Sequence, residues 1–354
     1  MGDFDISQIN NASEQESPKN KRNFSSIVKK SLIIFSLIFV VISAIFIYSY
    51  KYRNRSDDIT IGYSSIEDIA LVSIAENLEY FADKEVEIDY RNYDDELELI
   101  QALSESKVDV VFVEDLSIVM ANPAENKNKI ITSVLNAEKY FFVVDVKKGV
   151  FDVSSLSGQE VGVPDSYKTD YWLGKGFSNA GIDKRDVIIE TYKPEKLAEE
   201  LANAEVTGIF AWQPYVYESE TFEGSEVQQI VLPIQREGQS YTYLLTSESY
   251  IENNAEDLKK LVLSLISAEQ YIIENNDISV EYLAGEWSSE KRYVAEILNS
   301  YIYEVSISRE SKLSLSEKYE WSKTKSRSQD EEFQIESIYY YNLLREIDPK
   351  RAEF

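Results

Sequence analysis

Short apolar runs alternate with helical patterns in one early segment of the chain. Ile59–Tyr63, Glu85–Tyr90 and Val108–Val113 are alternating or β-branched runs, which predicts three strands. Asp68–Phe81 and Asp94–Ser104 carry apolar residues at helical spacing, which predicts a helix after each of the first two strands. This strand-helix-strand-helix-strand order is typical of a doubly wound sheet with parallel strands.

The same alternation resumes further along the chain. It predicts four strands, at Tyr140–Val146, Glu160–Val163, Asp186–Thr191 and Gly208–Ala211. It also predicts two helices, at Pro164–Ala180 and Glu195–Ala202. Val227–Pro233 and Ser240–Leu245 are predicted as strands that return toward the first unit. A long helical region is expected from Asn253 to Tyr282 and an amphipathic helix at Phe333–Glu346, whereas the polar segment 308–335 receives no element. Two α/β units are therefore expected.

The longest apolar run of the chain precedes these units. Ser31–Tyr50 contains no charge, Pro or Gly, and as a helix these twenty residues would span about 30 Å, the thickness of the hydrocarbon core. Residues 1–30 are polar and are expected to form a disordered tail. A cleaved signal peptide is the alternative, but the run is long and no small-residue cleavage site follows it. We expect one uncleaved transmembrane helix.

The distribution of basic residues predicts the orientation of that helix. Five Lys and Arg residues lie shortly before the run and three shortly after it, which favours a cytoplasmic N-terminus. The two α/β units are then expected on the periplasmic or extracellular side of the cytoplasmic membrane.

Composition excludes several classes of function. The chain has 36 Lys and Arg against 63 Asp and Glu, a net charge of −27, so it would repel nucleic acid. It contains no His and no Cys, which excludes catalytic triads, thiolate nucleophiles and zinc sites of the usual kind. Adjacent acids such as Glu114 and Asp115 could act as an acid–base pair or hold a hard metal ion, but chance adjacency is common in so acidic a chain. We expect no catalytic residue, metal or cofactor.

Candidate binding residues lie in four loops that follow predicted strands. They are Tyr63, Ser64, Ser65, Glu114, Asp115, Asp165, Ser166, Tyr167 and Trp212. Taken singly, each could be an ordinary turn or core residue. Because ligands of open α/β sheets bind outside the carboxyl ends of the strands, the four loops together predict a cleft between two sheets.

Three motifs then resemble a known family. Leu156–Pro164 reads L-x-G-x-x-V-x-V-P, Ala180–Val187 joins A-G-I to R-D-V, and Ala211–Tyr215 reads A-W-Q-P-Y. Their order and spacing resemble the ABC-transporter substrate-binding proteins of the sulfonate, nitrate, taurine and thiamine-precursor group, over roughly residues 58–280. Gln213 stands where that family usually has Glu. The family is usually soluble or lipid-anchored, so an N-terminal helix is a second departure.

The resemblance implies a two-lobed periplasmic binding protein type II fold, with two doubly wound sheets joined by hinge strands behind the transmembrane helix. One lobe would comprise residues 57–140 and 233–354, and the other residues 141–232. The protein would be a monomer that captures a small organic ligand for an ABC permease. A ligand-sensing ectodomain that signals to a membrane partner is the alternative. An enzyme resembling the thiamine-pyrimidine synthases would need the His and Cys that this chain lacks.

The ligand class stays open at this point. Two of the four loops contain acids, which suit a ligand with an ammonium group or a ring amine, such as taurine or an amine-bearing pyrimidine. Trp212 could stack on a planar ring of such a ligand. A sulfonate is compatible if the acids point away.

Overall fold

The computed structural model describes Ser43 and residues 58–222, 227–231, 239–325 and 333–353. The chain divides into two compact units, residues 1–56 and 57–354. Apart from Ser43, the expected tail 1–30 and the expected transmembrane segment 31–50 lie outside the described residues. Within the described ranges, no helix is both long enough and apolar enough to cross a membrane.

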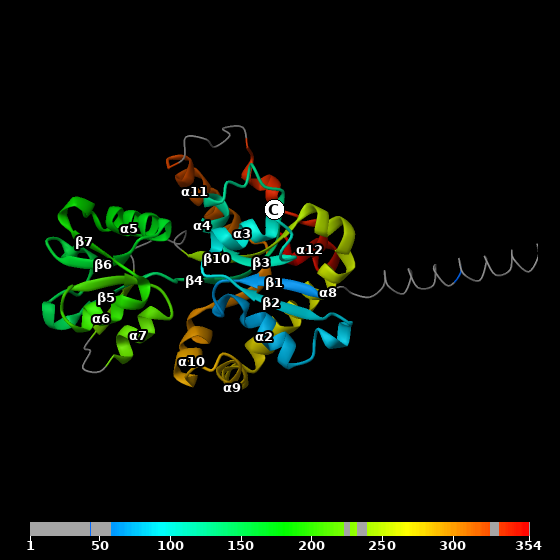
Figure 1. Cartoon of the computed structure of the whole chain (residues 1–354), viewed down its shortest axis with the longest axis horizontal. Helices are drawn as coiled ribbons and strands as arrows, with labels where there is room; N and C mark the ends of the chain where they lie inside the picture. Colours follow the sequence, from blue (N-terminus) through cyan, green and yellow to red (C-terminus); the bar gives the residue numbers. More distant parts are fainter. Residues whose placement is uncertain (1–42, 44–57, 223–226, 232–238, 326–332, 354) are drawn as a thin grey trace, which may run out of the picture. The chain divides into compact units, whose positions relative to one another are not determined.

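The larger sheet has six strands in the order β11-β4-β10-β3-β1-β2 (Figure 1). Its strands are β1 (Ile59–Tyr63), β2 (Ile88–Asn92), β3 (Val110–Glu114), β4 (Asn128–Ala137), β10 (Ser240–Ser247) and β11 (Ile302–Ser306). β1 pairs in parallel with β2 and β3, as the alternation predicted, and β10 is antiparallel to β3 and β4. The carboxyl ends of β1 and β3 therefore open on the same edge of the sheet.

The helices that accompany this sheet come from the beginning and from the end of residues 57–354. They are α2 (Ala70–Asn77), α3 (Glu96–Ser104), α4 (Asp115–Met120), α8 (Glu248–Glu274), α9 (Asn276–Glu286), α10 (Lys291–Ser300), α11 (Arg309–Lys323) and α12 (Asn342–Ile347), with 3-10 turns η1 (Glu67–Ile69) and η8 (Ile335–Ile338). α3 begins where the Asp95 carboxylate accepts hydrogen bonds from the backbone N–H groups of Leu97 and Glu98. We call this sheet and its helices the six-stranded half.

The smaller sheet has five strands in the order β7-β6-β8-β5-β9. Its strands are β5 (Phe141–Asp145), β6 (Glu160–Pro164), β7 (Ile188–Tyr192), β8 (Gly208–Ala211) and β9 (Val227–Val231), and its helices are α5 (Tyr167–Ala180), α6 (Leu197–Ala202) and α7 (Tyr215–Thr221). β6 runs parallel to β7 and β8, so its carboxyl end shares an edge with that of β8. This sheet and its helices form the five-stranded half, which residues 138–140 connect to β4 (Figure 1).

Several elements differ from the sequence prediction. β4 and β11 were not predicted, and β4 is buried along nearly all of its length, so it lacks the alternation that marks a half-buried strand. β9 pairs with β5 in the smaller sheet instead of returning to the sheet that contains β1, whereas β10 does pair within that larger sheet. The single helix predicted at Phe333–Glu346 is divided into η8 and α12, because Tyr339 forms a bridge with Ile130 of β4 between them.

Helix α11 occupies a segment in which no element was predicted. Its buried face is mostly polar and consists of Ser311, Ser314, Leu315, Lys318, Tyr319 and Ser322. A helix is predicted from a sequence by the spacing of its apolar residues. Because this helix buries serines and a lysine, that spacing is missing and the helix was not predicted.

Candidate functional site

A pocket of about 470 Å³ lies between the two halves and is lined by residues of both. Six of the predicted residues line it, namely Ser64, Ser65, Glu114, Ser166, Tyr167 and Trp212. They lie at or just after the carboxyl ends of β1, β3, β6 and β8, so residues from the four strand ends do meet at one site. Tyr63, Asp115 and Asp165 do not line it.

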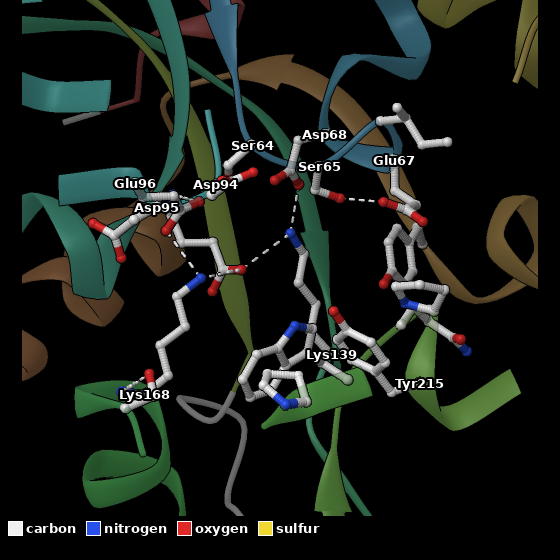
Figure 2. A pocket seen from close by; sticks show the side chains of 18 of the residues that line it. Ser64, Ser65, Glu67, Asp68, Asp94, Asp95, Glu96, Lys139, Lys168 and Tyr215 are labelled. Carbon is white, nitrogen blue, oxygen red and sulfur yellow. Dashed lines mark hydrogen bonds and ion pairs between the residues drawn. The ribbon is translucent and has the colours of Figure 1, made fainter. Parts of the chain in front are cut away.

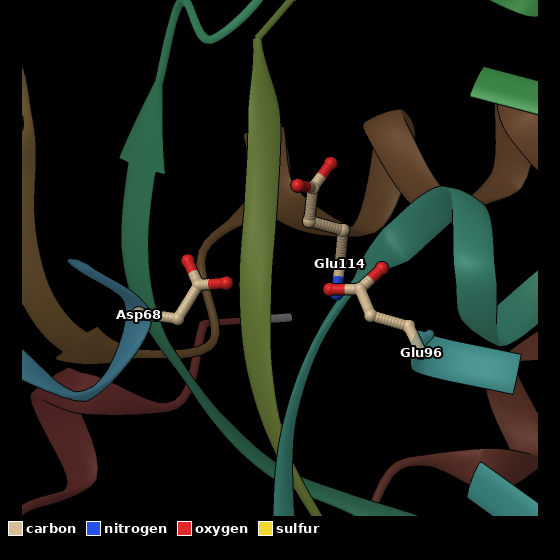
Figure 3. Close-up of side chains that lie close together, drawn as sticks. All are labelled: Asp68, Glu96 and Glu114. Carbon is tan, nitrogen blue, oxygen red and sulfur yellow. The ribbon is translucent and has the colours of Figure 1, made fainter. Parts of the chain in front are cut away.

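The floor of the pocket on the six-stranded half is a cluster of three buried carboxylates. Asp68 comes from η1, Glu96 from the first turn of α3 and Glu114 from the end of β3, and one oxygen of each lies within 4.8 Å of the others (Figure 3). Such a set could hold a metal ion in principle. Two ammonium groups instead lie among these acids.

Lys139 and Lys168 supply those ammonium groups. Lys139 Nζ lies 2.5 Å from Asp68 and 3.5 Å from Glu114, and Lys168 Nζ lies 2.9 Å from Glu96 and 3.3 Å from Glu114 (Figure 2). All five side chains are at most 15% exposed, so these are buried ion pairs. Glu114 is one of the acids expected to suit a ligand's ammonium group, and its carboxylate already contacts two lysines.

The two glutamates of the cluster respond differently to burial. Burial opposes ionisation of Glu114, but Lys168 and Lys139, with hydrogen bonds from Ser240 and Tyr140, hold the pKa of this carboxyl well below its usual range. Burial instead raises the pKa of Glu96, which Lys168 only partly offsets. Burial lowers the pKa of Lys139, but Asp68 and Glu114 more than offset it and hold that pKa above its usual value. Of these two glutamates, Glu114 is therefore the one held ionised.

The three predicted residues outside the pocket have other surroundings. Tyr63 packs edge-on against Tyr90 at 6.5 Å, and Asp165 is exposed. Asp115 points away from the pocket into the six-stranded half, where its Oδ2 lies 2.7 Å from Nζ of the fully buried Lys318. Glu114 ends β3 and Asp115 begins α4, so adjacent side chains diverge.

Several contacts join the halves around the pocket. The Tyr167 hydroxyl lies 2.8 Å from Ser117 Oγ of α4, beside the bridge that Lys168 forms to Glu96 and Glu114. The Ser166 hydroxyl accepts a hydrogen bond from the Lys168 backbone N–H and thereby caps helix α5. On the opposite flank, the Tyr217 hydroxyl of α7 donates to Glu290 at 2.8 Å. The halves are thus held together on both flanks of the pocket.

The other end of the pocket combines one acid with aromatic rings. Glu67 and Tyr215 lie toward one end in Figure 2, and Lys168 and Glu96 toward the other. The Glu67 carboxylate accepts hydrogen bonds from the hydroxyls of Ser65 and Tyr293. The aromatic side chains that line the pocket as a whole are Tyr167, Trp212, Tyr215, Tyr293 and Tyr301.

Seven charged lining residues escaped the sequence analysis, namely Glu67, Asp68, Asp94, Asp95, Glu96, Lys139 and Lys168. Lys168 directly follows the predicted residues Ser166 and Tyr167, so the argument that selected this loop could also have included Lys168. Lys139 lies in the connection between the sheets, where no motif marks it.

Comparisons with known proteins agree with this architecture. No curated protein sequence matches the chain. The aliphatic sulphonate binding protein SsuA from Escherichia coli has a similar structure, with a TM-score of 0.67 and 16% identity over 81% of this chain and 98% of that one. SsuA from Xanthomonas axonopodis pv. citri, an alkanesulfonate-binding protein whose structure contains MOPS, has a TM-score of 0.63. Its identity is 15%, over 80% of this chain and 98% of that one.

A third similar structure is a mutant of DSZB, an enzyme, in complex with biphenyl-2-sulfinic acid, with a TM-score of 0.65 and 13% identity over 83% of this chain and all of that one. At these identities the likeness shows the periplasmic-binding-protein type of fold. A family model described as NMT1/THI5 like matches residues 67–278, which is more than half of the chain and agrees with the resemblance found in its motifs. The chain belongs to the NMT1/THI5-like family.

Proposed function

We propose that this protein is the solute-binding component of an ABC importer, which captures a small organic ligand between its two halves. The observation that carries the proposal is the pocket of about 470 Å³, because residues of both halves line it. That volume lies in the range usual for small-molecule sites. Membership of the NMT1/THI5-like family and the fold shared with sulfonate-binding proteins support the same function.

The proposed cycle is closure of two lobes on a ligand. The lobes correspond to residues 57–140 with 233–354, and to residues 141–232. Opening would separate Lys168 from Glu96 and Glu114 and expose the pocket, and ligand contacts with both lobes would shift the equilibrium back to the closed form. A permease would then recognise the closed monomer.

We assign binding and no chemical step. DSZB indicates that a related fold can carry an enzyme, so the fold alone does not decide this question. The chain has no His and no Cys, and the buried acids of the pocket are mostly paired with lysines. These features support a receptor.

We propose further that residues 31–50 anchor the protein in the cytoplasmic membrane, with the binding unit outside. The uncharged run of twenty residues and the basic residues before it support this topology. Protease added to intact cells should degrade the binding unit and spare the tail. Release of the whole chain by carbonate washing would contradict the anchor.

The receptor function is tested by thermal unfolding of the full-length chain against a ligand panel. The panel holds taurine, alkanesulfonates, nitrate, hydroxymethylpyrimidines and polyamines. A ligand at one hundred times its dissociation constant should stabilise the protein by about 2.7 kcal/mol. Trp212→Ala, which removes a lining ring, is the control that should reduce the shift. A flat response to the whole panel, from a folded sample, would contradict the proposal.

A further inference from the structure

The charges that line the pocket do not balance. The lining includes six carboxylates, those of Glu67, Asp68, Asp94, Asp95, Glu96 and Glu114, and two ammonium groups, those of Lys139 and Lys168. This is a formal excess of four negative charges, and the lining contains no arginine. An anionic ligand would have to enter against this field.

Neither lysine is free to receive an anion. Lys139 is shared by Asp68 and Glu114, and Lys168 by Glu96 and Glu114, in contacts between 2.5 and 3.5 Å. An anion could gain an ammonium partner only by displacing a buried carboxylate, which would then lose its own partner. The arrangement therefore disfavours sulfonates and similar anions.

Among the lining acids of the described residues, Glu67 is the buried one without a counter-charge. Its side chain is buried, with the residue 5% exposed, and its described hydrogen-bond donors are the neutral hydroxyls of Ser65 and Tyr293. Among the described residues, no Lys or Arg forms an ion pair with it. A buried carboxylate without a cation is unfavourable, and a positively charged group beside it would relieve that cost.

The surroundings of Glu67 fit an organic body attached to such a cation. Tyr293, which donates to Glu67, and Tyr301 line the pocket from the six-stranded half, and Trp212 and Tyr215 line it from the five-stranded half. Aromatic faces attract ammonium groups and also pack against alkyl or planar groups. We propose that the pocket binds an organic cation, a protonated amine whose ammonium group pairs with Glu67 and whose body packs against these rings.

This inference rests on the proposed receptor function, so its test uses probes that differ only in charge. Two trios serve, phenethylamine with phenethyl alcohol and phenylethanesulfonate, and butylamine with butanol and butanesulfonate. Each is titrated into the full-length chain by calorimetry and thermal unfolding at low salt. The amine of each trio should bind at least about tenfold more tightly than the alcohol, and the sulfonate should bind most weakly.

A variant then assigns the selectivity to Glu67. Glu67→Gln keeps the shape of the side chain and removes its charge, so amine affinity should fall by about tenfold or more while alcohol affinity stays within twofold. Glu269→Gln is the matched control, because Glu269 is also a buried glutamate of the six-stranded half but pairs with Arg351 at 2.7 Å away from the pocket. Its amine affinity should equal that of the unaltered chain.

The outcomes separate the two ideas. Sulfonates that bind as tightly as the amines would overturn the cation inference and leave the receptor function standing. Amines without any effect at tens of millimolar would also overturn it, and the receptor function would fall as well only if the wider panel were flat. The charge comparison uses the unaltered chain, so it decides the question even if Glu67→Gln does not fold.

Discussion

Lys168 provides the most direct test of how the halves are held closed. Its ammonium group belongs to the five-stranded half, and both of its carboxylate partners belong to the six-stranded half. Lys168→Met would retain most of the side-chain volume and remove the charge. Glu96 and Glu114 would then share a cluster with Asp68 that retains a single ammonium group, that of Lys139.

The magnitude follows from burial of these groups. Glu96 and Glu114 are 3% and 7% exposed, and removing one partner of a buried ion pair typically costs about 3–5 kcal/mol. Opening the halves would return both carboxylates to water and relieve that cost. The closed form should therefore lose about 3 kcal/mol relative to the open form, roughly a 150-fold change in their ratio.

The absence of native cysteine makes the assay simple. Single cysteines at the exposed positions Glu98 of α3 and Asn179 of α5 would carry a donor and an acceptor dye, one on each half. Without ligand, Lys168→Met should shift the transfer-efficiency distribution toward the open form. Lys196→Met is the control, because Lys196 forms an exposed pair within one half. An unchanged distribution for Lys168→Met would refute the reasoning.

Three further predictions follow from other contacts. Trp212→Ala should weaken binding of any ligand found for the pocket by at least about tenfold in calorimetry, with the fold intact by circular dichroism, and unchanged affinity would remove Trp212 from the site. The pKa of Glu114 is lowered in the folded protein, so its ionised form stabilises the fold above pH about 4.3 and this contribution is lost as pH falls. The loss of unfolding free energy in Glu114→Gln should accordingly be larger at pH 7 than at pH 3, and an equal loss at both would contradict that pKa. Lys318→Met should cost about 3–5 kcal/mol in urea unfolding because it leaves Asp115 buried without its cation, and adding Asp115→Asn should recover much of that loss if the ion pair is the cause.

The sequence was most informative where strands are buried and parallel. Val110–Glu114 is buried at every position, and its run of β-branched and aromatic residues is the pattern typical of such a strand. The loop positions after β1, β3, β6 and β8 were predicted because the carboxyl ends of parallel strands share an edge. That rule depends on topology alone, so it needs no knowledge of side-chain partners.

The same reasoning could not find the charge balance of the pocket. Glu114 interacts with Lys139 and Lys168, which are 25 and 54 positions further along the chain, and no local pattern records such a pairing. It also could not separate Glu114 from Asp115, since the direction of each side chain depends on where β3 ends and α4 begins. Local sequence thus indicated where acids gather, but tertiary contacts decide which of them a ligand can reach.

The polar face of α11 has a mechanical consequence. Lys318 is fully buried and lies 5.1 Å from the ring of Trp172 in α5, and Trp321 packs edge-on against Tyr171 at 4.9 Å. On the opposite flank, Arg292 is 64% exposed where it meets Glu220 of α7 at 4.0 Å. The α11–α5 contact is therefore buried and aromatic, whereas the Arg292–Glu220 contact beside α7 is exposed. When the two halves are pulled apart, we expect the contacts beside α7 to break at lower force than those between α11 and α5.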